Sequence, residues 1–165
     1  MPVDSSSFRQ ALSQFASGVT VVTTRDAQGQ PQGLTVSSFC SVSLTPPMVL
    51  VCVDRRSEAH TGFQASGIFG VSVLAEHQEE LSRRFAGGVD DKFAGIELVS
   101  GRSGAALIPG ALAHLECRLV FAHPGGDHTI YVGEVESLSV FPGRPLLYHG
   151  SGYRRLDTGN GTGAC

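Results

Sequence analysis

The stretch GLTVSSFCSVSLTPPMVLVCVD, residues 33–54, decides how the rest of the chain is organised. It holds two runs of strand-forming residues separated by a Thr-Pro-Pro turn. The second run, residues 48–53, is apolar throughout, which is typical of a strand buried on both faces. Along the first run lies a cluster of hydroxyl side chains, Ser37, Ser38, Ser41 and Ser43. This cluster predicts a site for a flat polar ligand, although a hairpin with solvated serines fits the same composition.

Length, composition and charge limit the classes of protein to which the chain can belong. Its 165 residues are enough for one domain with its own hydrophobic core. Charged residues make up only 16% and there are 21 glycines, a composition that favours β structure with many turns. A formal charge of −3 provides no basic field for nucleic acid or for an anionic membrane. We therefore expect a small-molecule ligand.

The cysteines and the chain start indicate a cytoplasmic protein without a metal centre. The four cysteines show no CxxC spacing and no disulfide framework, and the histidines show no HExxH motif. The first residues lack a signal peptide, and no apolar run is long enough to cross a membrane. No GxSxG motif is present, so nucleophilic catalysis has little support.

Hydrophobic periodicity and turn residues predict strands joined mainly by hairpins. We expect helices over 5–16 (with Ser5, Ser6 or Ser7 as N-cap), 58–65 (with Ser57 as N-cap) and 76–85, strands over 19–24, 34–39, 48–53, 67–74, 112–123 and 128–140, and a last hairpin over 146–156, with 96–108 unassigned. The apolar parity of the strand over 128–140 slips beside Gly133, which predicts a β-bulge.

This order of elements predicts a mainly β fold with a few short flanking helices. A doubly wound parallel sheet needs crossover helices, which the chain mostly lacks, so a closed or nearly closed antiparallel barrel fits better. Neither GxGxxG nor a P-loop occurs, so a nucleotide would bind outside a Rossmann fold. We expect a single domain over residues 1–156 and a flexible, glycine-rich tail over 157–165.

Two polar features are candidates for ligand contact. His128 directly follows a Gly-Gly-Asp turn, where an imidazole can either contact an aromatic ligand or simply be an exposed hairpin residue. Arg55 and Arg56 precede a helix start, which favours an anion site, but solvated arginines on a surface helix fit equally well.

An ordered set of motifs nevertheless resembles the flavin reductase-like proteins, the small reductase components of two-component flavin-dependent monooxygenases. The motifs are FASGVTVVTT (15–24), GLTVSSFCSVSLTPPMVLVCV (33–53), RRS (55–57), LSRRFAG (81–87), DKFAG (91–95), GALAHLECRL (110–119), GDHTIYVGEV (126–135) and PLLYHGSGYRRL (145–156). The resemblance implies an FMN-binding split β-barrel, a homodimer and NAD(P)H-dependent reduction of FMN or FAD for a partner monooxygenase. Cys40 and Thr45 depart from the usual family pattern.

The resemblance also implies roles for individual residues. Thr35, Val36, Ser37 and Ser38 match the segment lining the flavin ring, and Cys52, Val53 and Asp54 match the next strand end. Arg56 and Ser57 match the ribityl-phosphate region, and Arg84 and Phe85 match a second phosphate and ring-edge contact. His128 matches the catalytic-site histidine beside the nicotinamide, and Tyr153 and Arg154 match the segment holding the pyridine nucleotide.

These residues suit hydride transfer, which needs two stacked rings and no protein nucleophile. Backbone amides and hydroxyls of residues 35–38 would donate hydrogen bonds to the negative charge that develops on the reduced flavin. His128 would orient the nicotinamide. Two alternatives stay open: a flavin-binding carrier or sensor without turnover, and a bare structural dimer. We expect the helix over 5–16 and the segment 142–149 to meet across the dimer interface. FMN against FAD and NADH against NADPH are undecided.

Overall fold

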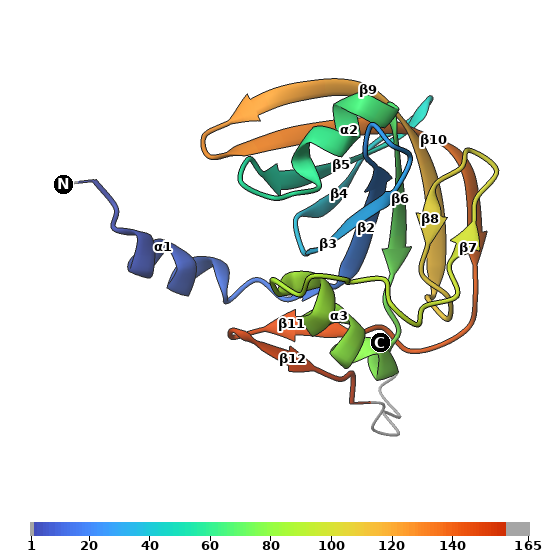
Figure 1. Cartoon of the computed structure of the whole chain (residues 1–165). Helices are drawn as coiled ribbons and strands as arrows, with labels where there is room; N and C mark the ends of the chain where they lie inside the picture. Colours follow the sequence, from blue (N-terminus) through green and yellow to red (C-terminus); the bar gives the residue numbers. More distant parts are fainter. Residues whose placement is uncertain (1, 158–165) are drawn as a thin grey trace.

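A computed structural model of the chain describes residues 2–157, so most of the predicted tail, with Cys165, lies outside the described residues. The fold is mainly antiparallel β with three short α-helices, as expected (Figure 1). Within residues 2–157, no helix combines the length and the apolar character needed to cross a membrane. In chain order the elements are α1 Ser5–Leu12, β1 Ser17–Gly18, β2 Thr20–Arg25, β3 Pro31–Val36, β4 Phe39–Leu44, β5 Pro47–Asp54, α2 His60–Ser66, β6 Ile68–Val73, the 3₁₀ turn η1 Glu76–Gln78, α3 Glu79–Ala86, β7 Val99–Ser100, β8 Ala106–Leu107, β9 Ala113–Gly125, β10 His128–Val140, β11 Leu147–His149 and β12 Gly152–Arg154.

The main sheet has seven strands in the order β3-β2-β6-β9-β10-β5-β4. Its two edge strands, β3 and β4, are consecutive in the chain and are joined only by Ser37 and Ser38. Because a linker of this length spans about 10 Å at most, the two edges of the sheet must approach each other. The sheet therefore curls into a barrel that is open along the line between β3 and β4, which is the split barrel expected from the sequence (Figure 1).

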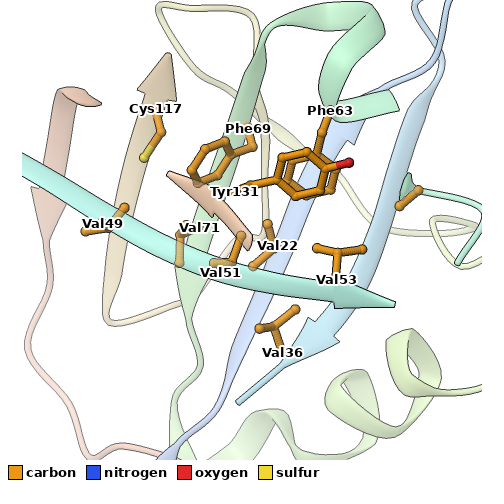
Figure 2. Close-up of a cluster of buried hydrophobic side chains, with 11 residues drawn as sticks. Val22, Val36, Val49, Val51, Val53, Phe63, Phe69, Val71, Cys117 and Tyr131 are labelled. Atoms are coloured by element: carbon orange, nitrogen blue, oxygen red, sulfur yellow. The ribbon is translucent and has the colours of Figure 1, made fainter. Parts of the chain in front are cut away.

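Valines and aromatic rings fill the barrel interior (Figure 2). Phe63 of α2 stacks on Tyr131 of β10 with 4.4 Å between ring centroids and 8° between ring planes, and Phe69 of β6 is tilted against Phe63. Burying each such side chain contributes roughly 1.5–3 kcal/mol. The valines of this core are Val22, Val36, Val49, Val51, Val53 and Val71.

Strand β5 is buried on one face only, so the expectation of a strand buried on both faces is wrong. Val49, Val51 and Val53 point into the barrel, whereas Leu50 and Cys52 are only half-buried. Both sets are apolar, and for that reason the sequence shows no alternation. The outer face of β5 borders a cavity that belongs to the candidate site described below.

The β9–β10 hairpin and the predicted bulge are confirmed. β9 and β10 pair antiparallel around the turn at Gly126 and Asp127, and their register shifts between Val132 and Gly133. A Cβ atom at Gly133 would lie 2.4 Å from Cε1 of Phe69, so the core aromatic ring requires glycine there.

α1 begins at Ser5 as expected but ends at Leu12, whereas α2 and α3 begin later than the sequence suggested, at His60 and Glu79. The N-cap of α1 is Asp4, whose carboxylate accepts hydrogen bonds from the amides of Ser6 and Ser7, and α2 begins at His60 with Ala59 as N-cap. Ser57 instead forms a turn, in which its amide donates to the Asp54 carbonyl. The expectation of a helix start capped by Ser57 is therefore wrong, whereas anion binding by Arg56 and Ser57 stays a prediction.

α2 lies over one end of the barrel, and α3 lies at the other end beside the ribbon of β11 and β12 (Figure 1). A second core cluster joins that end to the sheet and consists of Val19, Val21, Leu74, Phe85, Ile108 and Leu146. The unassigned segment 96–108 contains the two short strands β7 and β8, which pair with each other. α1 extends away from the barrel and has no buried residue (Figure 1).

The cysteine thiols differ in their surroundings, and this predicts a difference in reactivity. Burial raises the pKa of the Cys117 thiol to about 12, with a smaller contribution from Glu116 and Glu136, whereas Cys40 is exposed. Because the thiolate is the reactive form, iodoacetamide at mildly alkaline pH should modify Cys40 and leave Cys117 untouched. Peptide mass mapping before and after denaturation checks this. Rapid labelling of Cys117 in the folded protein would contradict its placement in the core.

Candidate functional site

Three neighbouring cavities lie around the end of β3, the end of β5 and the C-terminal ribbon. The charged cavity, of about 600 Å³, is lined by Thr35, Asp54, Arg56, Ser57 and Phe85, together with Leu34, Glu58, Lys92 and the loop 86–90. The hydroxyl cavity, of about 630 Å³, is lined by Ser37, Ser38 and Cys52, together with Cys40, Leu50, Tyr148, Ser151 and the end of α1. The tyrosine cavity, of about 320 Å³, is lined by Arg83, Ala86, Gly87, Tyr148, Ser151, Gly152 and Tyr153. Most of the predicted residues therefore come together from four separate parts of the chain.

The link between β3 and β4 presents unpaired backbone donors. Ser37 and Ser38 lie outside the strands, both are exposed, and within residues 2–157 neither backbone amide donates a hydrogen bond. They lie where the two edges of the sheet approach each other, beside the hydroxyl cavity. A planar ligand with acceptor atoms on its edge can therefore bind to the backbone here.

Two of the three nearby hydroxyl groups already have partners in the protein. Thr35 Oγ1 donates to the carbonyl of Ser82 at 2.6 Å, which ties β3 to α3. Ser38 Oγ accepts from the amide of Cys52 and donates to its carbonyl, both at 3.2 Å, which ties the link to β5. These hydroxyls position the segment, and the amides of Ser37 and Ser38 are the groups left for a ligand.

Asp54 and Arg56 form an ion pair at the end of β5. Arg56 Nη2 lies 2.8 Å from Asp54 Oδ2, and the Arg56 amide donates to Asp54 Oδ1 at 2.8 Å. The side-chain hydrogen bond from Arg56 holds the pKa of Asp54 well below its usual range. Asp54 thus keeps its negative charge and orients the guanidinium, which is otherwise exposed to solvent.

His128 stands opposite Asp54 in the pairing of β10 with β5. Its Nδ1 lies 2.7 Å from Asp127 Oδ1, and this hydrogen bond lowers the pKa of Asp127. Because a carboxylate only accepts, Nδ1 carries the proton and Nε2 is left for a ligand. The Arg55 amide donates to the Asp127 carbonyl at 3.1 Å and holds the turn against the end of β5.

Five predicted residues line none of the three cavities, namely Val36, Val53, Arg84, His128 and Arg154. Val36 and Val53 are buried in the barrel core, so only their backbone can meet a ligand. The Arg84 guanidinium donates to the carbonyls of Asp91 and Ala94 and thereby holds the loop after α3. Phe85 is buried against Phe93 and contributes to the wall of the charged cavity.

The C-terminal ribbon is held against α3 through Tyr153. Its hydroxyl lies 2.8 Å from Ser82 Oγ, and the Arg83 guanidinium lies over its ring at 4.7 Å from the centroid. A guanidinium over a tyrosine face is attractive by roughly 0.5–1 kcal/mol at an exposed site. Arg154 is exposed, donates to the Tyr153 carbonyl and does not line these cavities.

Sequence reasoning missed Lys92, Asp127 and Tyr148. Lys92 Nζ lies 3.4 Å from the carbonyls of Gly33 and Phe85 and adds a second cation to the charged cavity. Asp127 immediately precedes His128, and this adjacency was the available signal. Tyr148 packs edge-on against Tyr153, and only the pairing of β11 with β12 reveals that contact.

Taken together, the cavities provide unpaired amides and two cations, and the His128 imidazole lies on the neighbouring strand opposite Asp54. Glu58 and Asp90 also lie on the wall of the charged cavity, so the charge there is mixed. A phosphate would therefore be held by direct hydrogen bonds from Arg56 and Lys92 more than by net charge. The arrangement suits a heterocycle with acceptor edges and a phosphate-bearing chain.

Comparison with protein families agrees with this reading. The family model described as "Flavin reductase like domain" matches residues 12–157. An NADH-dependent flavin reductase of Rhodococcus sp is 42% identical over 151 residues, covering 90% of this chain and 85% of the relative. The reductase component of 4-hydroxyphenylacetate 3-monooxygenase from Thermus thermophilus is 45% identical over 150 residues, covering 90% of this chain and 95% of the relative.

Solved structures give the same result for the fold. The NADH:FAD oxidoreductase of Streptomyces globisporus C-1027, solved in complex with NAD and FAD fragments, superposes with a TM-score of 0.88 at 42% identity. The match covers 96% of this chain and 98% of that chain. The similarity thus extends over the barrel, the helices and the C-terminal ribbon together.

Proposed function

Because the chain belongs to the flavin reductase-like domain family, we propose that it is an NADH-dependent flavin reductase that passes a hydride to FMN or FAD. The reduced flavin would then serve a partner monooxygenase, as the printed name of the Thermus thermophilus relative implies for that protein. NADH is favoured over NADPH because relatives at this identity are named for NADH. The cytoplasmic location and the single domain over residues 1–156 stay predictions.

The unpaired amides of Ser37 and Ser38 are the observation that carries the proposal. A flavin ring has carbonyl and ring-nitrogen acceptors along one edge, so two exposed donors in succession fit it. Thr35 and Ser38 hold these amides in place through their hydroxyl groups, so little ordering is needed when the ring binds. Arg56, Ser57 and Lys92 would hold the phosphate-bearing chain in the charged cavity.

When bound, the flavin supplies the chemistry of accepting a hydride, and the protein supplies position. The Ser37 and Ser38 amides would donate to acceptors that gain electron density, which favours transfer. His128 would bind the nicotinamide through Nε2 while Asp127 holds Nδ1. Tyr153 and Arg154 would contact the remainder of the pyridine nucleotide from the C-terminal ribbon.

The test is NADH oxidation by the purified chain with FMN, with FAD or without added flavin. We expect turnover only with added flavin, and the preferred flavin follows from the two rates. No turnover with either flavin and either nucleotide, together with measurable flavin binding, would select the carrier or sensor instead. Absence of flavin binding would leave only the structural dimer.

The exposed apolar surface supports a homodimer as part of this proposal. In α1 and the residues after it, Phe8, Leu12 and Phe15 are 55%, 58% and 78% exposed. Leu44 at the end of β4 is 91% exposed, and Val140 on β10 is 75% exposed. We propose that a second copy of the chain covers these exposed apolar side chains.

We expect sedimentation velocity to give twice the monomer mass at micromolar concentration. Replacing Phe15 with Asp should shift the equilibrium toward monomer, because it places a charge where an apolar contact is proposed. Replacing the exposed Glu80 of α3 with Gln is the matched control and should leave the mass unchanged. A monomer at micromolar concentration for the unmodified chain would refute the dimer.

A further inference from the structure

A patch of polar side chains lies on the outer face of the barrel, away from the proposed flavin site. His114 and Glu116 of β9 stand opposite Ser139 and Ser137 of β10 in the strand pairing. Paired residues share one face of a sheet, so these four side chains form a compact array. His114 and Glu116 are only 6% and 5% exposed, although both are polar.

The β7–β8 hairpin covers one side of this array and satisfies part of it. His114 Nε2 donates to the Ile108 carbonyl at 2.7 Å, and the amide and hydroxyl of Ser103 donate to Glu116 Oε2 at 2.6 and 2.7 Å. Gly101 lets the carboxylate approach, because a Cβ there would lie 2.4 Å from Glu116 Oε2. The hairpin is therefore anchored on Glu116 and His114.

The other side of the array opens into a cavity of about 600 Å³. This volume lies within the usual range for small-molecule sites. Leu107 and Phe141 provide apolar walls, and the Phe141 ring is edge-on to His114 at 5.4 Å. Its lining shares no residue with the charged, hydroxyl or tyrosine cavities.

His114 has an acceptor without a partner in this cavity. Because a carbonyl oxygen only accepts, the proton on Nε2 leaves Nδ1 of the neutral ring as an acceptor. Within residues 2–157 no donor is bonded to Nδ1, and this atom is not among those sealed from solvent. A nine-tenths buried imidazole that borders a cavity thus has one acceptor without a partner within the described part of the protein.

Glu116 is a buried carboxylate that forms no direct ion pair within the described residues, although the exposed Arg102 also lines this cavity. Burial raises its pKa, but hydrogen bonds from Ser103, Arg102 and Ser137 outweigh burial and leave the pKa below its usual value, so the group is charged at neutral pH. Among residues 2–157 no Lys, Arg or His side chain forms an ion pair with it. A buried charge of this kind is normally paired.

We propose that this cavity is a second ligand site, which binds a small organic cation of the arylalkylammonium or amidinium class. The cationic N–H groups would donate to Glu116, His114 Nδ1 and the hydroxyls of Ser137 and Ser139. The apolar body would lie against Phe141 and Leu107. Neither flavin nor NADH is needed for this binding.

The probes are benzylammonium, phenethylammonium and benzamidinium, with benzyl alcohol as the neutral analogue, titrated calorimetrically into the full-length chain. We expect at least one cation to bind about tenfold more tightly than benzyl alcohol, because a hydrogen bond to a charged group is worth more than a neutral one. Glu116→Gln should remove this preference while keeping the size of the side chain.

Ser139→Leu is the second variant, because Glu116→Gln also loosens the β7–β8 hairpin. Ser139 is exposed and forms no side-chain hydrogen bond in residues 2–157, so leucine should fill the cavity without harm to folding. We expect Ser139→Leu to abolish cation binding and to leave the melting temperature and flavin-dependent NADH oxidation unchanged. Failure of all three cations to bind the unmodified chain, or equal binding to Ser139→Leu, would overturn the site.

Discussion

Replacing His128 with Ala is expected to lower kcat/KM for NADH about 100-fold, because a misplaced nicotinamide loses that much rate. The same change should leave the dissociation constant for FMN or FAD within about twofold, since the flavin is proposed to bind mainly elsewhere. The reason is geometric: His128 stands at the mouth of the β9–β10 hairpin opposite Asp54, whereas the unpaired amides lie on the link between β3 and β4.

Asp127→Asn is the matched comparison for this variant. Asparagine keeps the size of the side chain but can present an N–H to Nδ1 in place of an acceptor, which removes the preference for the tautomer with Nε2 free. We expect an intermediate loss of kcat/KM for NADH and no change in flavin affinity. Steady-state kinetics with NADH and fluorescence titration of flavin separate the two effects. An equal loss of NADH use and flavin binding in His128→Ala would count against the assigned role.

Replacing Tyr131 with Ala should lower the free energy of unfolding by about 3–5 kcal/mol, as for other fully buried aromatic residues. Tyr131 is completely buried, stacks on Phe63 and donates a hydrogen bond to the His60 carbonyl at 3.0 Å (Figure 2). Its removal leaves a cavity in a core whose neighbouring valines cannot rearrange far, because β-branched side chains are stiff. A loss of this size is a large part of the stability of a small domain.

Tyr131→Phe is the control, because it keeps the ring and removes only the hydroxyl. The expected cost is about 0.5–1.5 kcal/mol, since the half-buried His60 carbonyl then loses its side-chain donor. Urea unfolding followed by circular dichroism measures both variants, and unchanged m-values would show that the change lies in stability. A loss below about 1 kcal/mol for Tyr131→Ala would mean that the ring is not part of a tightly packed core.

Local patterns in the sequence predicted the hairpins well. The hairpin of β2 with β3, the Gly126-Asp127 turn and the last hairpin formed as expected, because a short loop between two apolar runs leaves an antiparallel pair as the simplest arrangement. The bounds of the strand expected over 34–39 are wrong, since β3 runs over Pro31–Val36 and Phe39 begins β4. The parity slip at Gly133 marked a true register shift. Helix starts were less predictable, because the N-cap of α1 is Asp4 and none of the three serines that follow it.

The sequence predicted which segments form the site, but it predicted the roles of individual side chains less well. Arg84 carries the right charge for a phosphate, yet carbonyls of the following loop take its guanidinium. Val36 and Val53 lie in the right segments but face the core. Whether a strand residue faces the core or the solvent depends on the register of the strand. A run that is apolar at every position does not reveal that register.

The amino-acid sequence by itself determined the β class, the order of the hairpins and the family, because these depend on local turn chemistry and on motifs kept in order. Only the tertiary structure decided which groups are available to a ligand. Thr35 bonds to Ser82, 47 positions away in the chain, and Ser38 bonds to Cys52, 14 positions away. Such partners meet only after the sheet has closed, and their hydrogen bonds leave the backbone amides of Ser37 and Ser38 available to a ligand.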